Sequence, residues 1–230
     1  MRSGLGFGGA VLTLPFLLLI LDQPLVFLPL IAVHLLIFSS LTVYQNHRDT
    51  DSPTTVNWAF IKWSLPIMAI PKAIGVIGVI TLPGELISGF IFVIVSVYAV
   101  SYILDRPFTS NNRVVDVLLI ALGGYVSGTS LIAAPLVVPV AASRVERAQL
   151  RDTLFVLWFI LVAVKLAAFI WVGVDMQWIH HLWLLPCAAL GHVIGLRFHD
   201  YALSRDTALF FRVIGVGLLA VSITGLLQMA

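Results

Sequence analysis

The sequence has very little charge. Only 10% of its 230 residues are Asp, Glu, Lys or Arg, whereas an ordinary soluble domain has roughly 25%. Hydrophobic residues make up 60% of the chain. A soluble globular fold is therefore excluded. The formal net charge of +2 and the dispersed basic residues also argue against nucleic-acid binding, and no block of like charge marks a charged tail.

Residues that usually carry out catalysis or bind metals are scarce as well. The single cysteine, Cys187, lies in an apolar run, which excludes disulfides and cysteine-based metal sites. The two glutamates, Glu85 and Glu146, both lie in loops, and no zinc-protease motif, nucleophile elbow or phosphate loop occurs. A His192/His199 pair alone does not make a metal centre. We therefore expect no enzyme activity, no cofactor and no metal.

Long apolar runs dominate the chain instead. Each run has about 20 residues, which is long enough to cross a hydrocarbon core of roughly 30 Å. The polar breaks between the runs are too short to hold a soluble domain. The N-terminus is expected to be retained, because no small-residue cleavage site follows Met1 and Arg2. The pattern predicts an all-α polytopic membrane protein with eight segments: 4–21, 26–44, 58–82, 86–104, 114–142, 153–172, 178–198 and 208–229.

The chain repeats itself at an offset of 120 residues. Tryptophan, proline and glycine are scarce enough that matches between positions 120 residues apart are informative. These matches predict a tandem duplication. The repeats are residues 1–104 and 114–230, joined by a cytoplasmic linker at 105–113. The first repeat is N-terminally shortened, since residues 114–123 have almost no counterpart before Gly4. The matched pairs include Gly4/Gly124, Gly8/Gly128, Pro15/Pro135, Trp58/Trp178, Trp63/Trp183, Pro66/Pro186 and Gly75/Gly195.

The arginines of the loops predict the orientation of the two repeats. If segment 114–142 is a re-entrant hairpin broken near Gly123-Gly124 and Gly128, eight loop arginines fall on one face, as expected for the cytoplasmic side. Two arms of about 13 residues reach only the middle of the bilayer. Three crossings plus a hairpin per copy would make the repeats inverted, as in many secondary transporters. The alternative is eight full crossings with parallel repeats. The arginines are Arg48, Arg106, Arg113, Arg144, Arg147, Arg151, Arg197 and Arg205.

Two glycine-rich stretches resemble the signature of the sulfite exporter TauE/SafE family. The first is Ser3-Gly4-Leu5-Gly6-Phe7-Gly8-Gly9, followed by Pro15, and the second runs from Gly124 to Ser130 and leads to Pro135. The resemblance spans essentially the whole chain. It implies a multi-pass transporter in the plasma (inner) membrane for small sulfur-containing anions such as sulfite, sulfoacetate or thiosulfate.

Helices that restart in mid-membrane are candidate anion sites, because their first N–H groups lack partners and their dipole end is positive. We expect such starts after Gly8-Gly9 and after Gly128, with hydroxyl donors nearby. The alternative is that these glycines form close-packed helix faces. The hydroxyl donors of the second site are Ser127, Thr129 and Ser130.

Basic residues deep in the apolar segments are the second group of substrate-binding candidates. Lys72 and His192 occupy equivalent positions at the 120-residue offset, and Lys165 and His34 also lie in mid-segment. Charged groups at such depth usually face a cavity. For Lys165 the alternative is a side chain that reaches along its stem to the interface. For His34 it is an ordinary hydrogen-bonded contact, and titration of His34 or His192 could couple transport to protons.

These features predict a secondary transporter that moves a small anion by alternating access. Its partners are the anion, the lipid bilayer and a coupling proton or ion, and a homodimer is left open. Two other classes also stay open at this point, namely a membrane-embedded enzyme and a non-transporting assembly subunit.

Overall fold

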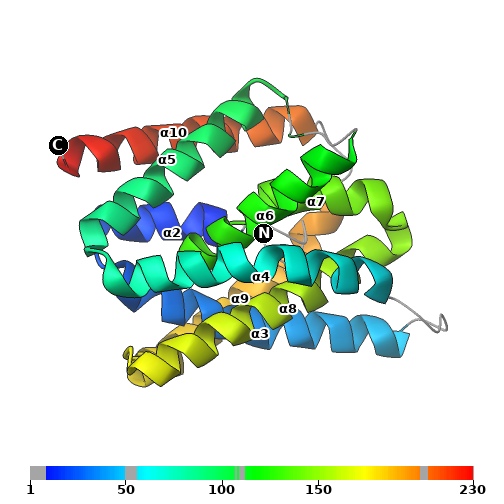
Figure 1. Ribbon diagram of the computed structural model, residues 1–230, viewed down its shortest axis with the longest axis horizontal. Coiled ribbons are helices and arrows are strands. Elements are labelled where there is room, and N and C mark those ends of the chain that lie inside the picture. Colours follow the sequence, from blue (N-terminus) through cyan, green and yellow to red (C-terminus); the bar gives the residue numbers. More distant parts are fainter. Residues whose placement is uncertain (1–8, 50–55, 107, 109–111, 203–206, 230) are drawn as a thin grey trace.

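The computed structural model describes residues 9–49, 56–106, 108, 112–202 and 207–229, and within them the fold is all helical. These residues form nine helices and no strand (Figure 1), which confirms the predicted all-α class. The helices are α2 (Gly9–Ile20), α3 (Pro24–Asp49), α4 (Trp58–Thr81), α5 (Gly84–Ile103), α6 (Arg113–Ser130), α7 (Ala134–Arg144), α8 (Arg147–Val172), α9 (Trp178–Ala202) and α10 (Thr207–Met229).

Several of these helices have the length and composition of membrane spans. Large apolar side chains such as Trp171 and Ile20 expose 90% and 83% of their surface, as expected where lipid is the solvent. The chain is therefore a multi-pass membrane protein. In the described part of the chain, six stretches are long and apolar enough to cross a membrane: Pro24–Tyr44, Trp58–Thr81, Gly84–Ile103, Arg113–Ser130, Arg147–Val172 and Phe211–Met229.

The helices run between two ends of the molecule. Helices α4 and α8 begin at the same end, because the backbone N–H of Asn57 donates to Thr153 Oγ1 at 2.8 Å. The Asn57 side chain also caps α4 by accepting from the N–H of Phe60 at 3.0 Å. At the opposite end, Gly84 lies against Pro24, so that α3 and α5 begin together. In Figure 1 these are the right-hand and left-hand ends.

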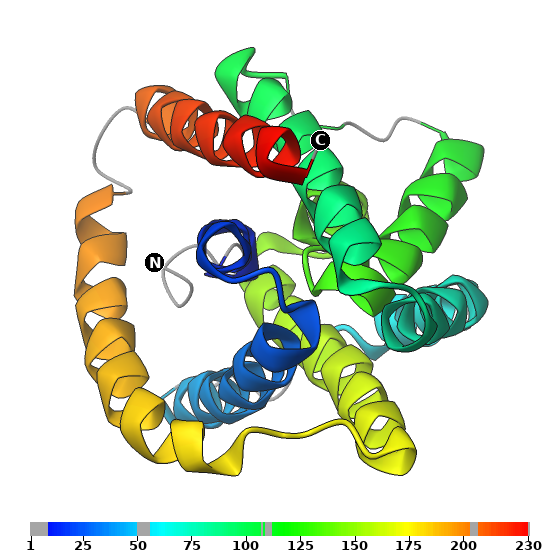
Figure 2. The same ribbon diagram turned by 90° about the vertical axis from the view of Figure 1, so that its left-hand side faces the viewer.

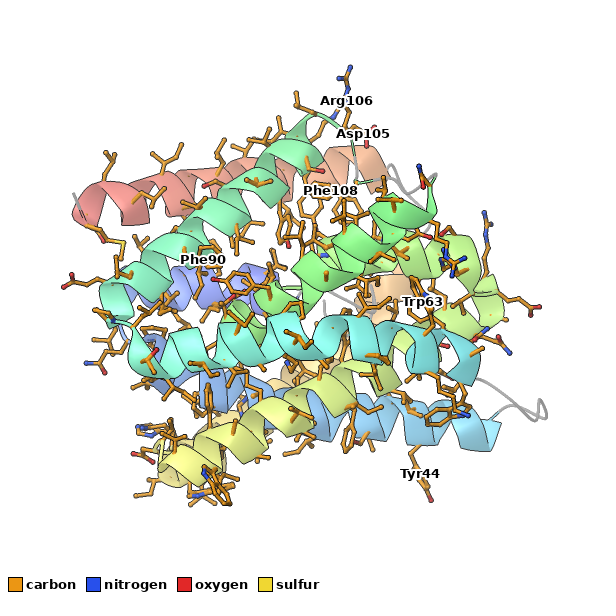
Figure 3. The ribbon with its side chains drawn as sticks, in the orientation of Figure 1. Tyr44, Trp63, Phe90, Asp105, Arg106 and Phe108 are labelled. Carbon is orange, nitrogen blue, oxygen red and sulfur yellow. The ribbon has the colours of Figure 1, made fainter. Side chains whose placement is uncertain are left out.

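The arginines gather at the right-hand end of Figure 1. Arg113 begins α6, Arg144 ends α7 and Arg147 begins α8. Figure 3 places Trp63 and Tyr44 toward this end as well. We call it the arginine-bearing end. Arg106 and Arg151 complete the described members of the predicted set, whereas the side chains of Arg48, Arg197 and Arg205 lie outside the described residues.

Two pairs of equivalent helices of the predicted repeats, α3/α8 and α5/α10, pack against each other. Helix α5 lies against α10 in opposite directions, because Phe92 contacts Gly225 while Ala99 lies beside Gly215. Helix α3 packs on α8 in the same antiparallel sense. Seen end-on in Figure 2, α2 lies among α3, α5 and α10, and α9 lies at the periphery. The core between these helices is apolar, with Leu14 and Leu157 fully buried.

Helices α6 and α7 form a hairpin whose two ends meet. Asp116 in the first turn of α6 forms an ion pair with Arg144 in the last turn of α7. The guanidinium of Arg144 also stacks on the ring of Trp63, 4.4 Å from its centroid. The chain therefore enters and leaves at the arginine-bearing end, as a hairpin requires.

The predicted position of the break in this hairpin was wrong. Helix α6 continues through Gly123, Gly124 and Gly128 to Ser130, and the helical hydrogen bonding stops only at residues 131–133. Leu131 there has a left-handed backbone with φ of 62°. Pro135 lies in the first turn of α7, where a missing N–H is tolerated.

Candidate functional site

Glycines bring α4 and α6 into backbone contact. A Cβ atom on Gly128 would lie 2.5 Å from the carbonyl oxygen of Lys72, and one on Gly75 would lie 2.5 Å from that of Tyr125. A Cβ on Gly124 would lie 2.7 Å from the carbonyl oxygen of Met68. Such distances exclude any side chain. The alternative reading of Gly124 and Gly128 as a close-packed face therefore holds, and the two helices run parallel.

This close approach places Lys72 against the end of α6. Lys72 is 3% exposed, and its Nζ donates to Ser127 Oγ at 2.9 Å. Both residues lie 14 positions into helices that start at the arginine-bearing end, or about 21 Å deep at 1.5 Å per residue. The amino group of Lys72 thus lies in the interior of the helix bundle.

Lys165 reaches the same turn of α6 from α8. It is fully buried, and its Nζ donates to the carbonyl oxygen of Thr129 at 3.2 Å. The ammonium also lies 5.3 Å from the ring centroid of Phe169. Two lysines from different helices therefore converge on residues 127–129. Because Lys165 turns inward onto α6, the structure contradicts the alternative in which its side chain reaches the interface.

The hydroxyl groups at the end of α6 are not equivalent. Ser130 Oγ donates to the carbonyl oxygen of Val126 at 3.0 Å, and Thr129 Oγ1 donates to the same oxygen at 3.2 Å. Such bonds to the preceding turn use the hydroxyl hydrogen. Ser127 accepts from Lys72, and its own hydrogen has no acceptor in the described part of the chain. In this structure the hydroxyl hydrogens of Thr129 and Ser130 are thus engaged within α6, and their role as donors to an anion stays a prediction.

The tip of the hairpin carries unpaired backbone donors. Residues 131–133 lie between the two helices, and Ile132 and Ala133 are 1% and 2% exposed. The N–H groups of Leu131, Ile132 and Ala133 donate to no acceptor among the described residues. Ala133 caps α7 without a side-chain hydrogen bond, so the positive end of that helix is also uncompensated. Buried unpaired amides are rare in proteins, and an anion would satisfy these.

A family model described as sulfite exporter TauE/SafE matches residues 1–225 of the 230. The chain belongs to the sulfite exporter TauE/SafE family. This confirms the resemblance carried by the duplicated glycine-rich stretches. No curated protein and no solved structure matches the chain significantly. TauE/SafE is a transporter family, and the membrane helices of this chain agree with that role.

The remaining predicted site residues of this TauE/SafE protein lie elsewhere. Gly9 lies at the start of the described part of α2, and Gly8 lies outside the described residues, so a helix start after Gly8-Gly9 stays a prediction. His192 belongs to α9, but its side chain is likewise outside the description. His34 of α3 contacts α9, where its Nε2 lies 3.3 Å from Nδ1 of His181.

The sequence did not point to the amides of residues 131–133, which the structure adds to the site. The one signal was Pro135, because a proline favours a helix start just before it and restricts the preceding residue. Helix α5 covers α6 one turn from its end, where the rings of Phe90 and Tyr125 meet edge to face with centroids 5.4 Å apart. Figure 3 shows Phe90 on α5, away from the arginine-bearing end.

Proposed function

We propose that this TauE/SafE protein is a secondary transporter that carries a small sulfur-containing oxyanion, sulfite or a close relative, across the plasma membrane. One observation carries the proposal: two buried lysines converge on a hairpin tip that also presents unpaired amides. The substrate would bind at this tip, between Lys72, Lys165 and the start of α7.

The donors at the tip suit an anion with several oxygen atoms. An ammonium group has three N–H donors, and each lysine uses one of them within the described residues. The remaining donors, the amides of residues 131–133 and the hydroxyl of Ser127 could surround an oxyanion from different directions. Hydrogen bonds to a charged acceptor are the stronger kind. The family membership supports sulfur as the central atom.

Burial of the tip fits a carrier rather than an open channel. Lys165 and Ser130 expose no surface, so the site is closed to solvent in this conformation. A carrier needs such an occluded state between its outward-open and inward-open forms. We propose that alternating access moves one part of the bundle against another and opens this tip to each side in turn.

The antiparallel pairs α3/α8 and α5/α10 support inverted repeats in residues 1–104 and 114–230. Each pair joins helices that occupy equivalent places in the two copies, and opposite directions are what inversion requires. In this arrangement α2, which begins at Gly9, is the counterpart of α7.

The experiment is uptake of labelled sulfite, thiosulfate and sulfoacetate into proteoliposomes, with and without a proton gradient. We expect flux of at least one of these anions. Lys72→Ala should weaken anion binding by about 10- to 100-fold, the worth of a hydrogen bond to a charged group. The protein should remain folded, because the described bond that is lost is the one to Ser127.

Lys62→Ala is the matched control, since Lys62 lies on the same helix but is exposed. It should leave flux and affinity unchanged. Absence of flux for every anion tested with the folded protein would contradict the transport function. Unchanged affinity in a folded Lys72→Ala variant would remove Lys72 from the site and leave transport in place.

A further inference from the structure

Among the described residues, the hairpin site has two amines and no acid to balance them. The described carboxylates of the surrounding helices lie at helix starts, far from the tip: Asp116 in α6 pairs with Arg144, Asp152 lies early in α8, and Glu85 begins α5. Lys72 and Lys165 lie about 21 and 27 Å along their helices from the arginine-bearing end. The other titratable residues on the helices packed around the site are Lys62, Arg113, Tyr125, Arg147, Arg151, His34, Tyr44, Tyr98 and Tyr102.

Neither described partner of the two lysines carries a charge. Lys72 donates to a serine hydroxyl, and Lys165 donates to a backbone carbonyl and lies on the ring of Phe169. Two ammonium groups buried against the same turn of α6 are costly without a counter-charge, because the surroundings cannot solvate them as water does. The cost is greater at membrane depth. An oxyanion at the tip would supply the missing charge.

From this placement we infer that the anion and its protons occupy the site together. Lys72 and Lys165 take up protons when the anion binds and release them when it leaves, so that the transported unit is an anion with protons. The inference rests on the proposed function and names its coupling ion. In each uptake step an amine nitrogen uses its lone pair to bind one proton from a hydronium ion or a buffer acid, which keeps the electron pair of the bond that breaks. No other bond in the protein forms or breaks.

Proton uptake together with the anion keeps the net charge of the site at zero in both the loaded and the empty form. A loaded site with a dianion and two ammonium groups is neutral, and an empty site with two amines is neutral too. Both forms can change conformation within the membrane without moving a bare charge through it. Fixed ammonium groups would instead leave the empty carrier with two uncompensated buried charges, and no described carboxylate is near enough to offset them.

The test counts protons taken up as the purified full-length protein binds thiosulfate in detergent. Thiosulfate is chosen because, unlike sulfite, it does not itself bind protons near neutral pH. Binding is measured by calorimetry at about pH 8, where an exposed lysine stays protonated. Paired titrations in buffers of different ionisation enthalpy give the number of protons. We expect an uptake of about one to two protons per thiosulfate, one for each buried amine.

Arginine variants keep a positive charge at each lysine position but remove the amine that would take up a proton. In Lys72→Arg and Lys165→Arg the guanidinium stays protonated at all times. Each variant should still bind thiosulfate, but with about one proton fewer than the unmodified protein, since one titrating amine is gone. Lys62→Arg, exposed on α4, is the matched control and should leave the proton count unchanged.

The possible outcomes separate failure of the proton coupling from failure of the proposed transport function. Thiosulfate binding without proton uptake by the unmodified protein would overturn the coupling and leave the transport function standing. Proton uptake that persists undiminished in both arginine variants would also overturn the assignment to these lysines. If the variants fail to fold, the count for the unmodified protein still decides whether protons accompany the anion. Failure to bind thiosulfate, sulfoacetate and sulfite alike would defeat the proposed function, and the inference with it.

Discussion

At the scale of single residues, Ser127 links the lysine of one helix to the end of another. Its hydroxyl accepts from Lys72, and we expect Ser127→Ala to leave that ammonium without a described partner. The lost bond to a charged group predicts thiosulfate binding weaker by about 10- to 100-fold, measured by calorimetry. Ser96→Ala in α5 is the control, because its hydroxyl bonds only to Phe92 of its own helix. Equal effects of the two variants would argue against a specific role for Ser127.

The sequence predicted some residues of this site and missed others for a physical reason. Lys72, Lys165 and Ser127 were foreseeable, because a charged or polar side chain deep in an apolar segment is expensive and therefore informative. The amides of residues 131–133 were not foreseeable, since every residue except proline carries such a donor. Only the chain fold reveals which of these donors lack partners.

At the scale of elements, the contact between α4 and α6 depends on the absence of side chains. Gly128→Ala would place a Cβ 2.5 Å from the carbonyl oxygen of Lys72, so the helices must separate. We expect a loss of about 1–3 kcal/mol in the free energy of unfolding, typical of overpacking. Thermal unfolding in detergent would measure it.

Gly78→Ala on α4 provides the control for that substitution. Its Cβ would meet only Leu82 Cδ1 at 3.7 Å, an ordinary contact, so the stability should be unchanged or slightly higher. If Gly128→Ala were as stable as Gly78→Ala, the close packing of the two helices would be contradicted.

The same contact explains why the break in the hairpin was misplaced. Glycine lowers helix stability by about 1 kcal/mol relative to alanine, and three glycines near the middle of one segment therefore predict an interruption. In the structure, backbone packing against Met68 and Gly75 keeps that stretch helical. A tertiary contact between residues more than 50 positions apart overrides the local preference, and hydropathy does not reveal it.

At the scale of the whole molecule, the hairpin fixes which loops share a side of the membrane. In a Cys187→Ser background, Arg106→Cys and Glu146→Cys should react with an impermeant maleimide only after the cells are permeabilised. Glu85→Cys and Asp175→Cys should react in intact cells, because these exposed residues lie at the opposite end. Labelling of positions 106 and 146 on opposite sides would contradict the hairpin.

Loop arginines favoured a hairpin at residues 114–142 because their positions depend on the membrane rather than on side-chain packing. Arg113, Arg144 and Arg147 lie at the neighbouring ends of α6, α7 and α8, as a hairpin at residues 114–142 requires. How α9 associates with the rest of the bundle could not be read from hydropathy, because lipid-facing and protein-facing sides look alike in an apolar helix.

The glycine contact of α4 with α6 has a consequence for how such a carrier moves. Helix α4 comes from the first half of the chain and the hairpin from the second, yet their backbones are pressed together with no room for sliding. In a transport cycle of the kind proposed above, the two rigid bodies would therefore not coincide with the two halves of the chain. Helix α4 would move together with the hairpin, and the boundary between the moving parts would run elsewhere through the bundle.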